Sequence, residues 1–211
     1  MPKMKKLLLI AALLGCFSAL RAEDSYMAKL YSGAEKGDAE KQFELGFYYA
    51  YGVCLKKDPE KGMPLLRKAA EQGLPVACAL INSNEKELAK LAEQGDVWAQ
   101  NVMGSFLTTA SYSAAVEMFR KAAEKGNAFA QCALGECYAQ GEGVEQDFTQ
   151  AAIWFRKAAE QGHPQGQLML AMCYRQGTGV KKDEKLAAYW CRQAADQGYE
   201  KAKAALKEIG E

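Results

Sequence analysis

One short pattern recurs along the chain and constrains its fold more than any other feature of the sequence. Its copies are "KAAEQG" at 68–73, "KLAEQG" at 90–95, "KAAEKG" at 121–126, "KAAEQG" at 157–162 and "QAADQG" at 193–198, with "AEKG" ending at Gly37. Successive closing glycines are 36, 22, 31, 36 and 36 residues apart. A period of this length indicates one structural unit used repeatedly, which buries its apolar face only by stacking on its neighbours.

The unit at 127–162 shows what is repeated. Ala130, Leu134 and Cys137 recur at three- and four-residue spacing, which predicts an amphipathic helix, here called helix A, ending near residue 140. The loop "GEGV" at 141–144 breaks it, and Asp147 is a natural N-cap for a second helix, helix B, over 148–161. Gly162 suits the left-handed position that ends helix B. We therefore predict an all-α fold, an α-solenoid of about five helical hairpins.

The period divides residues 23–198 into five units of unequal length: 34–73, 74–95, 96–126, 127–162 and 163–198. The second unit is 14 residues short, so we expect a truncated hairpin there, with Asn84 capping a helix from Glu85. The third is five residues short, and Pro64 is expected to weaken or kink the start of helix B in the first. Residues 199–211 are predicted to form a charged helix that covers the last apolar face.

The residue after each closing glycine looks suited to capping the next helix A. Asp38, Asp96, Asn127 and His163 stand there, whereas Leu74 is a weak cap. His163 is the only histidine, and Pro164 follows it at the first helical position, where a missing N–H costs nothing. We therefore interpret His163 as a capping residue instead of a catalytic base. Its replacement by Asn or Asp is expected to preserve function and slightly stabilise the fold.

The segment "AQCALGECYAQGEGVEQDFTQAAIWFRKAAEQG" at 130–162 resembles the Sel-like repeat (SLR), a relative of the tetratricopeptide repeat. Residues 166–198 are similar, with Ala171 for the usual glycine, as are residues 40–73, with Cys54 for a loop glycine. The resemblance covers about residues 34–198 and implies a concave surface, lined by helix A, that holds peptides or partner domains. The family's inward-facing positions correspond to Phe43, Phe47, Tyr51, Trp98, Asn101, Cys132, Glu136, Leu168, Met172 and Arg175.

Residues 1–22 read as a secretory signal, with three lysines before an apolar run. Two processing routes stay open: lipidation at Cys16 in the lipobox-like "LLGC", or cleavage after Ala22. Either predicts an exported bacterial protein that is periplasmic, anchored to the outer membrane or secreted. Removing the signal's four basic residues from the chain's 27 leaves 23 against 26 acidic ones. This net charge of −3 gives no support for nucleic-acid binding, and membrane contact is expected only through the lipid anchor.

Cys54, Cys78, Cys132, Cys137, Cys173 and Cys191 follow the signal, and both disulfides and buried thiols fit their number. Cys173 and Cys191 lie in helices A and B of one unit, so their pairing is an open question. No C-x-x-C pair is present, and we expect no metal and no cofactor. The resemblance also extends to cysteine-rich SLR relatives associated with β-lactam binding or hydrolysis, whose regular cysteine pairs are missing here.

Ser83 and Lys86 have the Ser-x-x-Lys spacing of penicillin-recognising enzymes, but neither companion motif, Ser-Asp-Asn or Lys-Thr-Gly, occurs. "GTGVKK" at 177–182 is a repeat turn and no strand precedes it, so we do not expect a nucleotide site. We therefore predict a non-enzymatic adaptor or scaffold that binds a protein or peptide partner and has no catalytic residues. The alternatives are weak β-lactam binding or hydrolysis and a purely structural envelope component.

Overall fold

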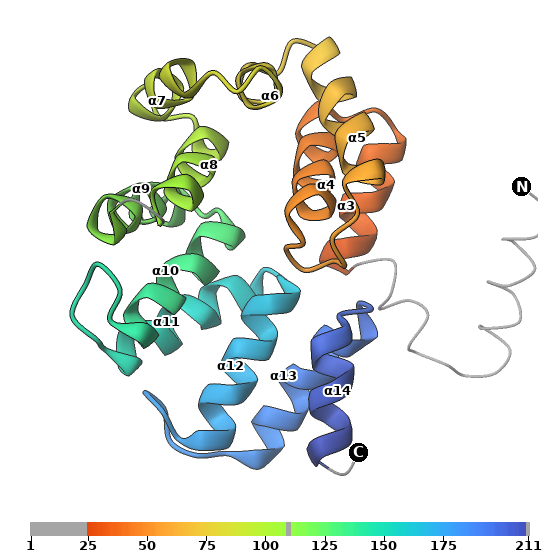
Figure 1. The fold of residues 1–211 in the computed structure, drawn as a ribbon. Helices are drawn as coiled ribbons and strands as arrows, with labels where there is room; N and C mark the ends of the chain where they lie inside the picture. The colour runs from red at the N-terminus through yellow and green to blue at the C-terminus, as the bar shows by residue number, and fades with distance from the viewer. Residues whose placement is uncertain (1–24, 109–110, 210–211) are drawn as a thin grey trace, which may run out of the picture.

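The computed structural model describes residues 25–108 and 111–209, and over these ranges the chain forms α-helices and no strands (Figure 1). The predicted all-α fold is thereby confirmed. The signal segment 1–22 and Cys16 lie outside the described residues. The helices are α3 (Tyr26–Glu35), α4 (Ala39–Tyr51), α5 (Pro59–Glu71), α6 (Pro75–Ile81), α7 (Glu85–Glu93), α8 (Val97–Leu107), α9 (Tyr112–Glu124), α10 (Ala128–Gln140), α11 (Phe148–Glu160), α12 (Pro164–Gln176), α13 (Glu184–Asp196) and α14 (Glu200–Ile209).

Each helix packs against the next along the chain, as a solenoid requires, and α10 also contacts α12. The capping residues predicted at the unit junctions explain where the A helices begin. Asp38, Asp96 and Asn127 each accept a hydrogen bond from the backbone N–H three residues on, and His163 does the same through Nδ1. Leu74 makes no side-chain cap. Asn84 caps α7, which begins at Glu85 as predicted.

Helices A and B of one unit approach closely because a glycine in helix A faces a large side chain in helix B. A Cβ on Gly135 would lie 2.6 Å from Cε1 of Phe155. In the last unit the same two positions hold Ala171 and Cys191, both buried. The extra methyl group on helix A is therefore matched by a smaller side chain on helix B, so the contact stays filled without overlap.

The loop after each full-length helix A turns through left-handed residues. Gly143 has φ 73°, and a Cβ there would lie 2.3 Å from the backbone carbonyl of Tyr112. In the first unit Cys54 takes the place of this glycine and keeps a positive φ of 54°. A residue with a Cβ costs about 1–2 kcal/mol in that conformation. The loop shape is thus retained at some strain.

The second unit is a short hairpin, with α6 and α7 only 7 and 9 residues long. The weakening expected at Pro64 does not interrupt α5, which runs through it from Pro59 to Glu71. Pro64 and Glu60 are both exposed, so water can bond the Glu60 carbonyl that loses its intrahelical partner. Helix α14 packs against α13, with Tyr199 and Ala202 buried in the last part of the core.

The helices bend round until the first and last units meet (Figure 1). The N–H of Met27, in α3, donates to Oε1 of Gln197 at 3.4 Å. At the start of α3, Tyr26 lies so close to the junction between α11 and α12 that a Cβ on Gly162 would be 3.2 Å from its Cβ. We call the contact of Tyr26, Met27 and Cys54 with Gly162, His163 and Gln197 the ring closure.

Candidate partner-binding pocket

His163 lies at the centre of the ring closure and is fully buried. Its ring meets Tyr26 and Tyr48 edge to face, with centroid distances of 5.7 and 6.1 Å. Its Nε2 lies 3.5 Å from Sγ of Cys54. The predicted capping role is confirmed. No local sequence pattern indicates that this cap also joins the two ends of the solenoid.

The pairing of Cys54 with His163 does not form an activated thiol. Nδ1 of His163 accepts the Gly166 N–H, so the ring proton is on Nε2 and points at the sulfur. Burial lowers the pKa of His163 to about 3 and raises the pKa of Cys54 to about 12, so both groups are neutral at pH 7. An imidazole that already carries its proton on the facing nitrogen cannot take one from the thiol.

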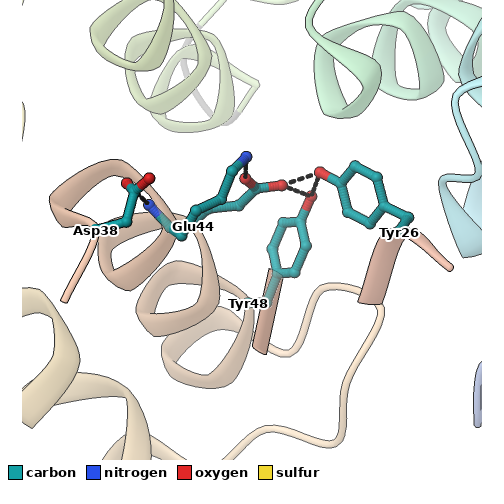
Figure 2. Close-up of polar contacts among 5 residues, drawn as sticks. Tyr26, Asp38, Glu44 and Tyr48 are labelled. Carbon is teal, nitrogen blue, oxygen red and sulfur yellow. Dashed lines mark hydrogen bonds and ion pairs between the residues drawn. The ribbon is translucent and has the colours of Figure 1, made fainter. Parts of the chain in front are cut away.

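The carboxylate of Glu44 holds Tyr26 in place (Figure 2). It accepts hydrogen bonds from the hydroxyls of Tyr26 and Tyr48 and pairs with the ammonium of Lys41 at 3.1 Å. Burial raises the pKa of Glu44 to about 7, against the smaller lowering effect of the Tyr48 hydrogen bond. Since Tyr26 and Tyr48 both contact His163, this carboxylate supports the ring closure from the first unit.

Aromatic side chains cross the inner face of the ring. Phe43 meets Trp98 at 5.3 Å between centroids, and Phe47 meets Phe129 at 5.8 Å. Phe43 and Phe47 are only 0 and 2% exposed, and Trp98 is partly buried against the same core. Their assignment to a partner-binding surface is therefore corrected for Phe43 and Phe47. The chain's bend brings α4 towards α8 and α10, so these rings pack on each other, and Phe43 and Phe47 offer no free face.

The other predicted contact residues divide by exposure. Asn101, Leu168 and Cys132 are buried, with side chains that point into the core between units. Their assignment to the partner-binding surface is therefore also wrong. Tyr51 and Met172 are 45 and 42% exposed, and Arg175 is exposed too. Of the ten positions, only Glu136 lines the pocket described next, and whether it binds a partner stays a prediction.

A pocket of about 600 Å³ opens on the inner face beside the ring closure, and we call it the ring pocket. Parts of the chain that are far apart in sequence build it together: the loop after α4, helices α8 to α10, and the starts of α12 and α14. Aromatic rings and aliphatic side chains supply most of its wall, and Glu136, Gln165 and Lys201 supply polar groups. Its size and mixed lining are typical of ligand-binding pockets.

Glu136 is the charged group set deepest in the ring pocket. Burial raises its pKa, while the hydrogen bond from Nε2 of Gln165 and the charge of Lys201 lower it. The nearby carboxylate of Glu142 raises it further. Lys201 and Lys56 are exposed, so the buried end of the pocket is acidic and the cations lie near solvent.

The six cysteines of the described ranges form no disulfides. Cys173 and Cys191 pack in different parts of the core, and the sulfur of Cys191 donates to the Ala202 carbonyl at 3.4 Å. The pairing left open between them is thus not formed here, because the two side chains face opposite neighbours. Cys137, at the position of Cys173 in the preceding unit, is a buried thiol whose pKa burial raises to about 11.

Ser83, in the turn between α6 and α7, and Lys86, in the first turn of α7, are exposed and do not line the ring pocket. Among residues 25–108 and 111–209, no group of three or more His, Cys, Asp or Glu side chains is placed to hold a metal ion. Within the same ranges no helix is long and apolar enough to cross a bilayer.

Sequence reasoning missed a set of glutamines that joins neighbouring units. Gln131 donates from Nε2 to the Ala123 carbonyl of the preceding helix B, and its Oε1 accepts from Gln161 at 2.7 Å. The same pair recurs as Gln42 with Gln72 and as Gln167 with Gln197. A pattern in the sequence could have revealed this set, since the glutamines recur at equivalent positions of the repeat. Gln100 has Lys125 where its partner would be, and its buried Oε1 has no hydrogen bond within the described ranges.

Stacked helical hairpins with capped junctions and an inner-face pocket define the chain as a helical-repeat protein of the tetratricopeptide type. The family model described as "Sel1 repeat" matches residues 39–74, 102–127, 128–163 and 164–199, more than half of the chain. The chain belongs to the Sel1 repeat family. Proteins of this family generally mediate protein–protein interactions and are typically non-enzymatic scaffolds. A comparison with curated proteins gives no match.

Solved structures agree with this assignment. A protective antigen of uropathogenic Escherichia coli with an SLR fold is 30% identical, with a TM-score of 0.60, over 87% of this chain and 44% of that one. A Sel1 repeat protein from Oxalobacter formigenes is 30% identical, with a TM-score of 0.56, over 83% and 56%. This chain thus spans about half the length of each. An immunity protein from Pseudomonas aeruginosa shares the fold at 19% identity, with a TM-score of 0.53, over 81% and 73%.

Proposed function

We propose that this protein is a non-enzymatic adaptor that captures a segment of a protein partner in the ring pocket. The observation that supports the proposal is the pocket itself, which residues from four separate parts of the ring build on its inner face. Sel1 repeats are protein-interaction modules, and a pocket of this size accommodates a few side chains of a partner. The proposed binding site is therefore the lining of the ring pocket, in place of the surface predicted at Phe43 and Phe47.

Site-specific photo-crosslinking in the bacterial envelope tests this function. A photoreactive amino acid replaces Tyr112, which lines the ring pocket and is 41% exposed, or Tyr189 on α13, which is 42% exposed and outside it. We expect one protein to crosslink from position 112 and not from position 189. Equal crosslinking from both positions, or none from position 112, would contradict capture in the pocket.

The same proposal places the protein in the cell envelope, on the basis of the signal-like residues 1–22. The mature protein is periplasmic, anchored to the outer membrane through Cys16 or secreted. Mass spectrometry of the mature chain tests this, because lipidation at Cys16 and cleavage after Ala22 give different masses. A mature chain that retains residues 1–22 would rule out both routes.

A further inference from the structure

We propose that the ring pocket binds a cationic side chain, an arginine or lysine of the protein partner, and that Glu136 is its counter-ion. This inference rests on the proposed function and adds to it the chemistry of the segment that enters. Four features of the pocket support it: the buried carboxylate, the neutral group that hydrogen-bonds it, the direction of α10, and the aromatic wall.

The carboxylate of Glu136 lies mostly out of solvent, and the hydrogen bond that it accepts comes from the neutral amide of Gln165. The Gln165 hydrogen bond and the charge of the exposed Lys201 offset the loss of water only in part, because the pKa of Glu136 stays raised. An apolar occupant would remove the remaining water from the carboxylate and so increase the cost of its desolvation. A cationic occupant would supply the missing partner through a charge-assisted hydrogen bond.

The surroundings of Glu136 also favour a positively charged occupant. Glu136 and Glu142 lie at the end of α10, where the helix dipole presents its negative pole. The negative charge of Glu142 also raises the pKa of the nearby Tyr112 hydroxyl, which is at the same end of the pocket. Phe119, Phe129 and Tyr112 line the space beside the carboxylates. Such rings suit the aliphatic stem and the charged head of an arginine.

The two lysines of the pocket do not favour an anionic occupant. Lys56 and Lys201 are exposed, so water solvates their ammonium groups without a ligand. An exposed ion pair with either would contribute little to binding, whereas a pair with the desolvated Glu136 would contribute much more. An anion placed deep in the pocket would also face Glu136 and Glu142.

Two synthetic peptides that differ only in charge provide the test. Acetyl-Gly-Leu-Arg-Leu-Gly-amide carries a guanidinium, and its citrulline counterpart has nearly the same shape without the charge. Binding to the full protein is measured by isothermal titration calorimetry, or by NMR where the affinity is weak. We expect the arginine peptide to bind about tenfold more tightly, which corresponds to about 1.4 kcal/mol. Equal affinities, or binding of neither peptide, would overturn the inference.

Substitutions link this preference to Glu136. Glu136→Gln keeps the shape and removes the charge, so the preference for arginine should disappear. Glu124→Gln is the matched control, because Glu124 is exposed at the end of α9 and does not line the pocket. Circular dichroism checks that both variants keep their helices. A preference that persists in Glu136→Gln would overturn the role of Glu136.

The inference and the proposed function can fail separately. If a partner crosslinks from position 112 but binds the Glu136→Gln variant with unchanged affinity, the pocket captures partners without a cationic side chain. In that case the proposed function stands and the inference fails. If crosslinking from position 112 fails while the arginine preference is present and depends on Glu136, the pocket has the stated chemistry but is not where the partner docks.

Discussion

Replacing Glu44 by glutamine should make the protein less sensitive to rising pH. Glu44 is buried between Tyr26 and Tyr48, and its pKa is raised from an ordinary 4.5 to about 7. A carboxyl group whose pKa is higher in the folded state binds its proton more tightly there. Its contribution to stability is therefore fully present below pH 4.5 and is lost as the pH rises through 7.

The size of the effect follows from the shift. One pKa unit corresponds to 1.36 kcal/mol, so a rise from 4.5 to about 7 means that ionising Glu44 lowers the free energy of unfolding by about 3 kcal/mol. Glutamine keeps the shape and one acceptor oxygen but cannot ionise. The free energy of unfolding of Glu44→Gln, relative to that of the wild type, should thus increase by about 3 kcal/mol between pH 4.5 and pH 8.

Urea unfolding of both proteins, followed by circular dichroism at several values of pH, measures this difference. Glu40→Gln on the same helix is the matched control, because Glu40 is exposed and this variant keeps Glu44. The difference in unfolding free energy between Glu40→Gln and wild type should change much less with pH. A difference between Glu44→Gln and wild type that is constant across this range would show that the carboxylate is not buried as described. A difference that falls with rising pH would refute the sign of the argument.

Three further substitutions test the packing of the ring, each by urea unfolding. Lys125→Gln restores the glutamine pair with Gln100 and should stabilise by about 1 kcal/mol; a loss of stability would contradict this pairing. Asn101→Leu should stabilise by about 1–3 kcal/mol, since the Asn101 amide is fully buried without a hydrogen bond among the described residues; a destabilised variant would mean that the amide has partners. His163→Asn should destabilise by about 1–3 kcal/mol, because asparagine keeps the cap but loses the contact with Tyr26, and unchanged stability would show that the ring closure contributes nothing.

The prediction for His163→Asn differs from the one that the sequence alone supports. From the sequence, His163 is only a cap, and its replacement by Asn or Asp is expected to preserve function and slightly stabilise the fold. Capping is a local property, so the residue after each closing glycine revealed it. The contacts with Tyr26 and Cys54 join residues more than a hundred positions apart, and no local pattern encodes them. They depend on how sharply the short second and third units bend the chain.

The same difference between local and long-range structure explains why Phe43 and Phe47 were wrongly assigned to the partner-binding surface. Helix bounds, caps and turns were predictable because each follows from a few neighbouring residues. Phe43 and Phe47 occupy inward-facing positions of their unit, but the ring is tight enough to bury the inward face of α4 against α8 and α10. A regular period favours an open groove, and the shortened units close it. Glu136 remained accessible because it lies beside the ring closure, where a pocket is left.

The claim that the ring pocket captures a partner is tested most directly by blocking its mouth. Gln140 is the exposed last residue of α10 and lines the pocket, and Gln176 is the equivalent exposed residue of α12 outside it. With the partner identified by crosslinking, its affinity is measured for Gln140→Trp and Gln176→Trp. We predict a loss of about tenfold or more, about 1.4 kcal/mol, for Gln140→Trp alone. Unchanged binding by Gln140→Trp, or an equal loss in both variants, would contradict the claim.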